Sequence, residues 1–228
     1  MSGPVTLDEL KTMAVEIAPE VQARPFYVVD QKACGLPTET AGGFAISHLA
    51  TNVFELPDWT GPGSVLAIDL QGCNTGQPRR AAAYARAIVV HELAHLVPMP
   101  ASETLRMIEA TPPEVVKANM RREMSIPADH VTTVTKTHGP AFIVRAAHLF
   151  IRAVATGYET QAADVLGYRW LTSLQHYLPF IIDDAIRMRF APFSAVDQLP
   201  IPEEVRRLHA RDGQRYQAYI KQGSEDAA

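Results

Sequence analysis

The stretch "AIVVHELAHLVPMP" (87–100) constrains this chain most, because it places His91 and His95 four residues apart. On an α-helix, two such residues lie about 40° apart around the axis and one turn apart in height, so both imidazoles can reach one metal ion. Glu92 is rotated by about 100° from His91, which keeps it off the ion but within reach of a neighbouring water. Because catalytic zinc sites usually have three protein ligands, the motif predicts an incomplete zinc site that needs a further ligand from elsewhere.

A glutamate from a later helix is one candidate for this third ligand. Glu114 is the best placed of these by its position after the motif, although it also stands where a capping box with Thr111 would use it. Three other acidic residues follow the motif at shorter or longer spacing, and they have no warrant beyond that spacing: Glu103, Glu109 and Glu123. Glu114 therefore remains the alternative third ligand.

His138, in "THGPAFIVRAAHL", is the stronger candidate. It stands at the start of an expected helix, and Gly139 and Pro140 after it fix the direction of the chain, as a preorganised ligand requires. A histidine held in this way loses little conformational freedom when it binds a metal ion. The sequence therefore favours His138 over the glutamates.

HELAH followed by "HGPAF" resembles the SprT-like zinc metallopeptidases, which include the Spartan-type DNA–protein crosslink proteases. That family pairs HExxH with a downstream His-Gly-x-x-Phe/Trp at the start of a helix. The resemblance implies that His91, His95 and His138 bind one Zn²⁺ per chain. It also implies that Glu92 is the general base that activates the zinc-bound water for peptide-bond hydrolysis. Phe142 would pack the third-ligand helix against the HExxH helix.

The residues around the motif predict an α+β fold. "TLDELKTMAVEIAP" has a capping box of Thr6 and Glu9 followed by apolar residues at helical spacing, so it predicts an N-terminal helix. The HExxH helix starts near Pro78 and stops at Pro98, and a long helix runs from Pro140 to Gly157. Three β-like segments, which we expect to form a small antiparallel sheet, lie at 25–30, 42–48 and 64–70.

The resemblance implies a zincin-like core of the minimal gluzincin type, with the sheet packed on the HExxH helix. Residues 96–137 form a longer connection between the ligands than typical relatives have. The cysteine zinc ribbon that often follows this domain is absent, since the chain has only two cysteines and no CxxC. We therefore expect a metallopeptidase domain at 1–157 with an insertion at 98–137, a helical extension packed on it at 158–222, and a disordered tail at 223–228.

Three further residues are candidates for supporting the site. His148 is too far along the helix of His138 to share the metal, because ten residues correspond to about 15 Å, so we expect it to be packed or to support a ligand. His130 precedes His138 in an expected loop and can be either an oxyanion-stabilising residue or an ordinary loop residue. Tyr158 is one of several residues that can polarise a substrate carbonyl.

Composition narrows the class of partner. With a net charge of −4 the chain has no global basic field, which disfavours a nucleic-acid binder but leaves a local basic patch open. The N-terminus lacks the apolar core of a signal peptide, and no apolar run is long enough to cross a membrane, so we expect a cytoplasmic protein. The favoured partner is a protein or peptide substrate. The alternatives are a non-catalytic protein stabilised by zinc, and a DNA-associated protease of the Spartan type.

Overall fold

The computed structural model describes residues 5–35, 42–73, 78–97, 112, 114–115, 118, 137–166 and 172–225. Its N-terminal part contains α1 (Leu7–Ile17), the 3₁₀ turn η1 (Pro19–Ala23), β1 (Phe26–Asp30), β2 (Gly43–Leu49), β3 (Gly63–Ile68), α2 (Leu70–Cys73) and α3 (Pro78–Leu96). Its C-terminal part contains α7 (Pro140–Thr156), α8 (Ala162–Val165), α9 (Leu174–Tyr177), η2 (Leu178–Phe180), α10 (Ile182–Arg187), α11 (Phe193–Val196) and α12 (Glu203–Glu225). Most of the expected insertion at 98–137 lies outside the described residues.

The sheet is mixed, which corrects the expectation of an antiparallel one. Its order is β1-β3-β2, with β1 parallel and β2 antiparallel to β3. The reason lies in β3, where all six residues are buried. A continuous apolar strand of this kind belongs in the middle of a sheet with both faces covered, whereas a one-sided antiparallel sheet alternates apolar and polar residues. β1 and β2 therefore occupy the two edges, and α+β remains the correct class.

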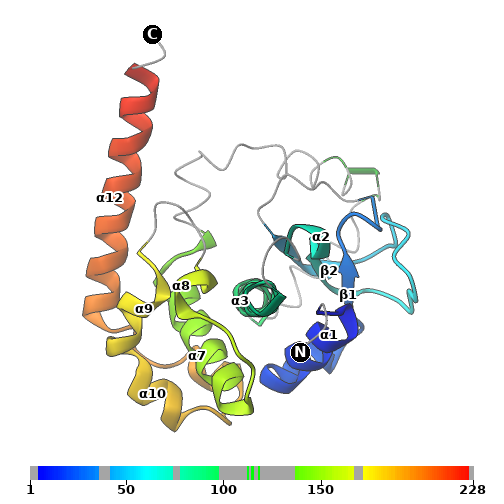
Figure 1. Ribbon diagram of the computed structural model, residues 1–228, viewed down its shortest axis with the longest axis horizontal. Coiled ribbons are helices and arrows are strands. Elements are labelled where there is room, and N and C mark those ends of the chain that lie inside the picture. The colour runs from blue at the N-terminus through cyan, green and yellow to red at the C-terminus, as the bar shows by residue number, and fades with distance from the viewer. Residues whose placement is uncertain are drawn as a thin grey trace.

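α3, which carries the HExxH motif, lies at the centre of the molecule. Figure 1 shows it end-on, with the sheet and α1 on one side and α7 and α8 on the other. Its sequence explains this position, because most of its residues from Ala81 onward are small or branched apolar side chains that are buried, whereas Arg80 is exposed and Arg86 is half-buried. A helix that is apolar over most of its surface is stable when neighbours cover those faces. The motif is thus held on a helix that is packed on two sides.

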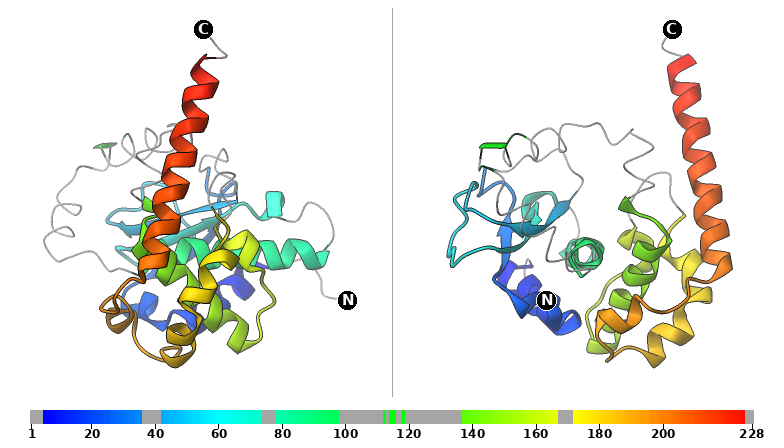
Figure 2. Two further views of the ribbon diagram at one scale, coloured as in Figure 1. Left: turned by 90° about the vertical axis from the view of Figure 1, so that its left-hand side faces the viewer. Right: turned by 180° about the vertical axis from the view of Figure 1, so that it is seen from behind.

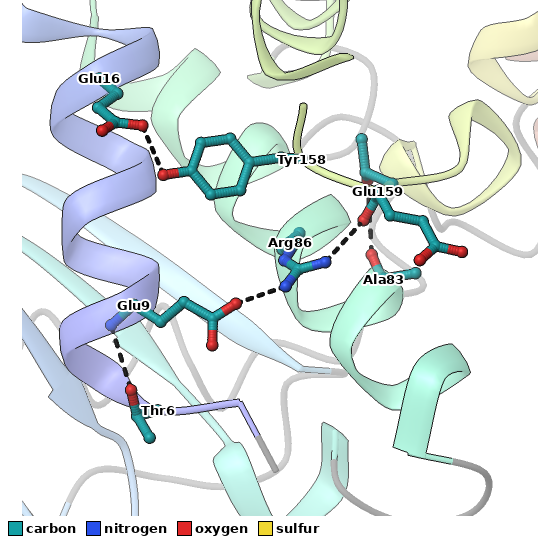
Figure 3. A network of polar contacts seen from close by, with 8 residues as sticks. Thr6, Glu9, Glu16, Ala83, Arg86, Tyr158 and Glu159 are labelled. Atoms are coloured by element: carbon teal, nitrogen blue, oxygen red, sulfur yellow. Dashed lines mark hydrogen bonds and ion pairs between the residues drawn. The ribbon is translucent and has the colours of Figure 1, made fainter. Parts of the chain in front are cut away.

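α1 has the Thr6 half of the predicted capping box, in which the Thr6 hydroxyl accepts a hydrogen bond from the backbone N–H of Glu9 at 3.2 Å, whereas the Glu9 carboxylate pairs with Arg86. A polar network then ties α1 to the outer side of α3 (Figure 3). Arg86 of α3 donates to the Glu9 carboxylate and to the backbone carbonyl of Glu159, just after α7. These contacts join the elements on both sides of α3.

α7 begins and ends as its sequence predicts. Pro140 occupies its first position, and Gly157 ends it in the left-handed conformation at φ 94°, which glycine adopts without strain. One side of the helix packs against α3, and another side packs against α10. His138 precedes this helix by two residues, so the packing of α7 sets where its ring can reach.

The segment after α7 is helical, as predicted. It is divided into short helices, of which α8, α9 and α10 span four to six residues each. The last helix is longer than expected: α12 continues to Glu225, whereas a disordered tail was expected from 223. Figure 2 shows the far end of α12 standing away from the rest of the protein. No helix among the described residues is long and apolar enough to cross a membrane.

Candidate metal centre

Three histidines from two distant segments meet at one point. His91 and His95 come from the last two turns of α3, and His138 comes from the turn before α7. The Nε2 atom of His138 lies 3.1 Å from Nε2 of His91 and 3.1 Å from Nε2 of His95. His91 and His138 are buried, and His95 is half-buried. The structure thus brings together both motif histidines and the histidine that the sequence favoured as third ligand.

These distances fit a shared metal ion. A metal–nitrogen bond of about 2.1 Å with tetrahedral angles places neighbouring ligand nitrogens about 3.4 Å apart. Without a cation or a shared proton, the lone pairs of facing neutral imidazole nitrogens would repel each other at this distance. The three histidines therefore form a site that could hold a metal ion, and it is the only such cluster of His, Cys, Asp and Glu side chains among the described residues.

The outer nitrogens of two rings have partners that fix the rings. His91 Nδ1 donates a hydrogen bond to the backbone carbonyl of Val165 at 2.8 Å, which places the lone pair of the neutral ring on Nε2, the atom that faces His138. His138 Nδ1 lies 3.0 Å from the hydroxyl of Thr137. Each of these two rings is therefore oriented from behind by an oxygen atom, as metal-binding histidines usually are.

Phe142 forms the apolar floor of the site. Its ring centroid lies 5.0 Å from that of His91, 4.4 Å from that of His95 and 4.7 Å from that of His138, and the side chain is buried. Phe142 is one turn past His138, so it lies between α7 and the histidines of α3. It packs the third-ligand helix against the HExxH helix, as the resemblance implies.

Burial sets the protonation of the site. Desolvation lowers the pKa of His91 to about 4, although its hydrogen bond to Val165 acts in the opposite direction. Desolvation also lowers the pKa of His95 to about 2, and repulsion from His91, His138 and Arg145 adds to this effect. Both rings are thus neutral at physiological pH, which is the form that binds metal ions.

Glu92 directly follows His91 on α3 and is also buried, with 8% of its surface exposed. Desolvation raises its pKa to about 8, because burial disfavours the charged carboxylate. A cation bound by the three histidines would favour the carboxylate again, since an opposite charge within a few ångströms stabilises the ionised form.

No family model, curated protein or solved structure matches this chain.

The other candidates from the sequence lie away from the three histidines or outside the described residues. Tyr158 donates to the carboxylate of Glu16 in α1 at 2.5 Å, within the network of Figure 3. His148 is buried on α7, where its charged neighbours are on α7, on α10 and directly after α11. Glu114, the alternative third ligand, is exposed and does not belong to the histidine cluster. His130 lies outside the described residues.

Sequence reasoning missed the two groups that orient the ligands. Val165 contributes only its backbone carbonyl, so no side-chain pattern could have identified it. Thr137 directly precedes His138, and a hydroxyl next to an expected ligand was a signal that could have been followed.

Proposed function

We propose that this protein is a zinc-dependent metallopeptidase with a zincin-like, SprT-like catalytic core. The observation that carries the proposal is the convergence of three histidine Nε2 atoms, together with a buried glutamate, Glu92, that directly follows the first of them in the sequence. Three nitrogen ligands in a compact group suit zinc, and within the described part of the chain these three are the only protein ligands, which leaves a fourth position open. A purely structural zinc site would normally have four protein ligands, so an open position supports catalysis.

The residues can perform peptide hydrolysis as follows. Zinc, when bound, supplies a Lewis acid that polarises the scissile carbonyl and lowers the pKa of water. The Glu92 carboxylate accepts a proton from the water whose oxygen forms the new bond to the carbonyl carbon. The same proton then passes from Glu92 to the amine that leaves when the carbon–nitrogen bond breaks, so the carboxylate is regenerated. Phe142 and the apolar wall of α3 limit the access of other water.

The edge of the sheet is suited to hold an extended peptide beside Glu92. Among the described residues, β2 pairs only with β3, so its other edge offers backbone groups for strand addition. The start of β2 also lies close to the site. A Cβ atom added to Gly43 would be 3.7 Å from Cγ of Glu92. A peptide paired with β2 would therefore pass near the carboxylate.

The substitution Glu92→Gln tests the proposed role of the carboxylate. We expect it to abolish hydrolysis of an unfolded protein or a fluorogenic peptide library, while about one zinc per chain is retained, because the amide cannot accept the proton. Hydrolysis is measured by mass spectrometry of the products, and zinc by elemental analysis. Glu114→Gln is the matched control, and it should keep both zinc and activity because Glu114 is exposed and lies outside the histidine cluster.

Two outcomes would contradict the proposal. If the purified wild-type protein takes up no zinc, the centre is not a zinc site. If Glu92→Gln leaves the biological function intact and chelation unfolds the chain, the zinc serves stability in a non-enzymatic protein instead.

A further inference from the structure

Thr137 is the side chain that contacts the rear of the third ligand. Its hydroxyl oxygen lies 3.0 Å from Nδ1 of His138, on the opposite side of the ring from the nitrogen that faces His91 and His95. The two residues are adjacent in sequence, so the contact can form without any other segment becoming ordered. Thr is β-branched and therefore restricted at χ1, so its side chain loses little conformational entropy when the contact forms.

His138 needs such a partner more than the motif histidines do. His91 and His95 belong to a continuous, enclosed helix, whereas His138 stands in a turn before Pro140. The ring of a histidine can expose either nitrogen, and the tautomer depends on the hydrogen bond that the other nitrogen makes. When Nε2 faces the metal, Nδ1 carries the hydrogen and must donate it. The Thr137 oxygen is the acceptor at that position.

We propose that Thr137 is a positioning residue that holds His138 in the ring orientation and tautomer required for metal binding. The inference rests on the proposed function, since it assumes that the three histidines bind zinc. It goes further by assigning part of the metal affinity to a side chain that does not touch the metal. Partners of this kind typically change metal affinity by about 10- to 100-fold when they are removed.

The test compares Thr137→Val, which keeps the shape but removes the hydroxyl, with Thr137→Ser, which keeps the hydroxyl. Zinc affinity is measured by competition with a chromophoric chelator, and the geometry of the site by the visible spectrum of the Co²⁺-substituted protein. We expect the valine variant to bind zinc about 10- to 100-fold more weakly and to change the Co²⁺ spectrum, and the serine variant to restore both. The full chain is used throughout.

Thr12→Val is the matched control, because Thr12 is an exposed threonine on α1 whose hydroxyl makes one hydrogen bond, to the backbone carbonyl of Asp8. It should leave zinc affinity unchanged. If the valine variant at 137 is unfolded in chelator, Thr137→Ala replaces it in the comparison with serine. Equal zinc affinity with and without the hydroxyl, in protein that binds zinc, overturns this inference alone. A wild-type chain that binds no zinc overturns the proposed function instead.

Discussion

At the scale of single residues, two positions, Gly43 at the start of β2 and His148 on α7, show how closely the interior is packed. Gly43 shows how tightly the surroundings are packed, because a Cβ atom at this position would lie 2.8 Å from the carbonyl oxygen of Ala67 and 2.8 Å from Cγ2 of Ile88. Only glycine lets the start of β2 approach α3 so closely. His148 is a second case, since its ring is fully buried and neither nitrogen has a hydrogen-bond partner in the described part of the chain.

His148 should make stability depend on pH. Desolvation lowers its pKa to about 4; Arg152 and Arg187 also lower it, while Asp184 and Asp197 raise it. Between this value and the unfolded pKa near 6.5, the unfolded chain takes up the proton first, so the free energy of unfolding falls as the pH falls through this window. By pH 4 the free energy of unfolding has fallen by roughly 3 kcal/mol because of this group. Above pH 6.5 the neutral ring costs nothing relative to the unfolded chain, so none of this free energy is lost.

The variant His148→Leu should remove that loss, and it should also stabilise the protein near pH 7 because a buried ring without hydrogen bonds is replaced by an apolar group. Urea unfolding of both proteins in chelator, at several pH values, measures the difference without a contribution from metal release. Parallel pH profiles for the two proteins would show that His148 does not titrate in this way.

At the scale of elements, the sequence predicted which segments are helices and strands far better than how they pair. Capping boxes, prolines and glycines are local signals, so the expected ranges of Thr6 to Pro19, Pro78 to Pro98 and Pro140 to Gly157 lie close to the observed bounds of α1, α3 and α7. The direction of β1 beside β3 depends on which strand is central, and that is decided by contacts between distant segments.

The pair formed by Glu9 and Arg86 should couple α1 to the motif helix. The Arg86 side chain is only 17% exposed, so its ion pair is less screened than a surface pair. A double-mutant cycle of Glu9→Gln and Arg86→Met should give a coupling energy of about 1 kcal/mol in urea unfolding. The control cycle uses Asp184 and Arg187, which are 42% and 62% exposed, and should give less than about 0.5 kcal/mol. Equal coupling in the two cycles would contradict the role of burial.

At the scale of the whole molecule, the fold does not depend on the metal ion for its core. One apolar cluster runs from α1 through α3 and α7 to α12, and it is closed without any contribution from the three histidines. The candidate ligands could be predicted from the sequence because motif spacing on a helix is local information. The carbonyl of Val165 could not, since it reaches His91 only through the packing of α8 on α3.

If the three histidines bind zinc as proposed, its removal should therefore lower the free energy of unfolding without unfolding the protein at room temperature. At free zinc about 1,000-fold above Kd, bound metal contributes about 4 kcal/mol, which corresponds to a fall in Tm of roughly 10 °C on chelation. Differential scanning calorimetry with and without chelator measures the shift, and addition of zinc should reverse it. Loss of the helical circular-dichroism signal on chelation at 25 °C would instead indicate a fold that requires the metal.

The enclosure of α3 between two layers has a consequence for the order of events during synthesis. The sheet and α1, on one side of the helix, are made before it, but α7 and α8, on the other side, are made after it. Until they emerge, one flank of an apolar helix stays uncovered, and His91 has neither His138 nor the Val165 carbonyl beside it. The ribosome therefore releases both motif histidines well before the chain can trap an ion, and any peptidase activity is delayed until the C-terminal helices have docked.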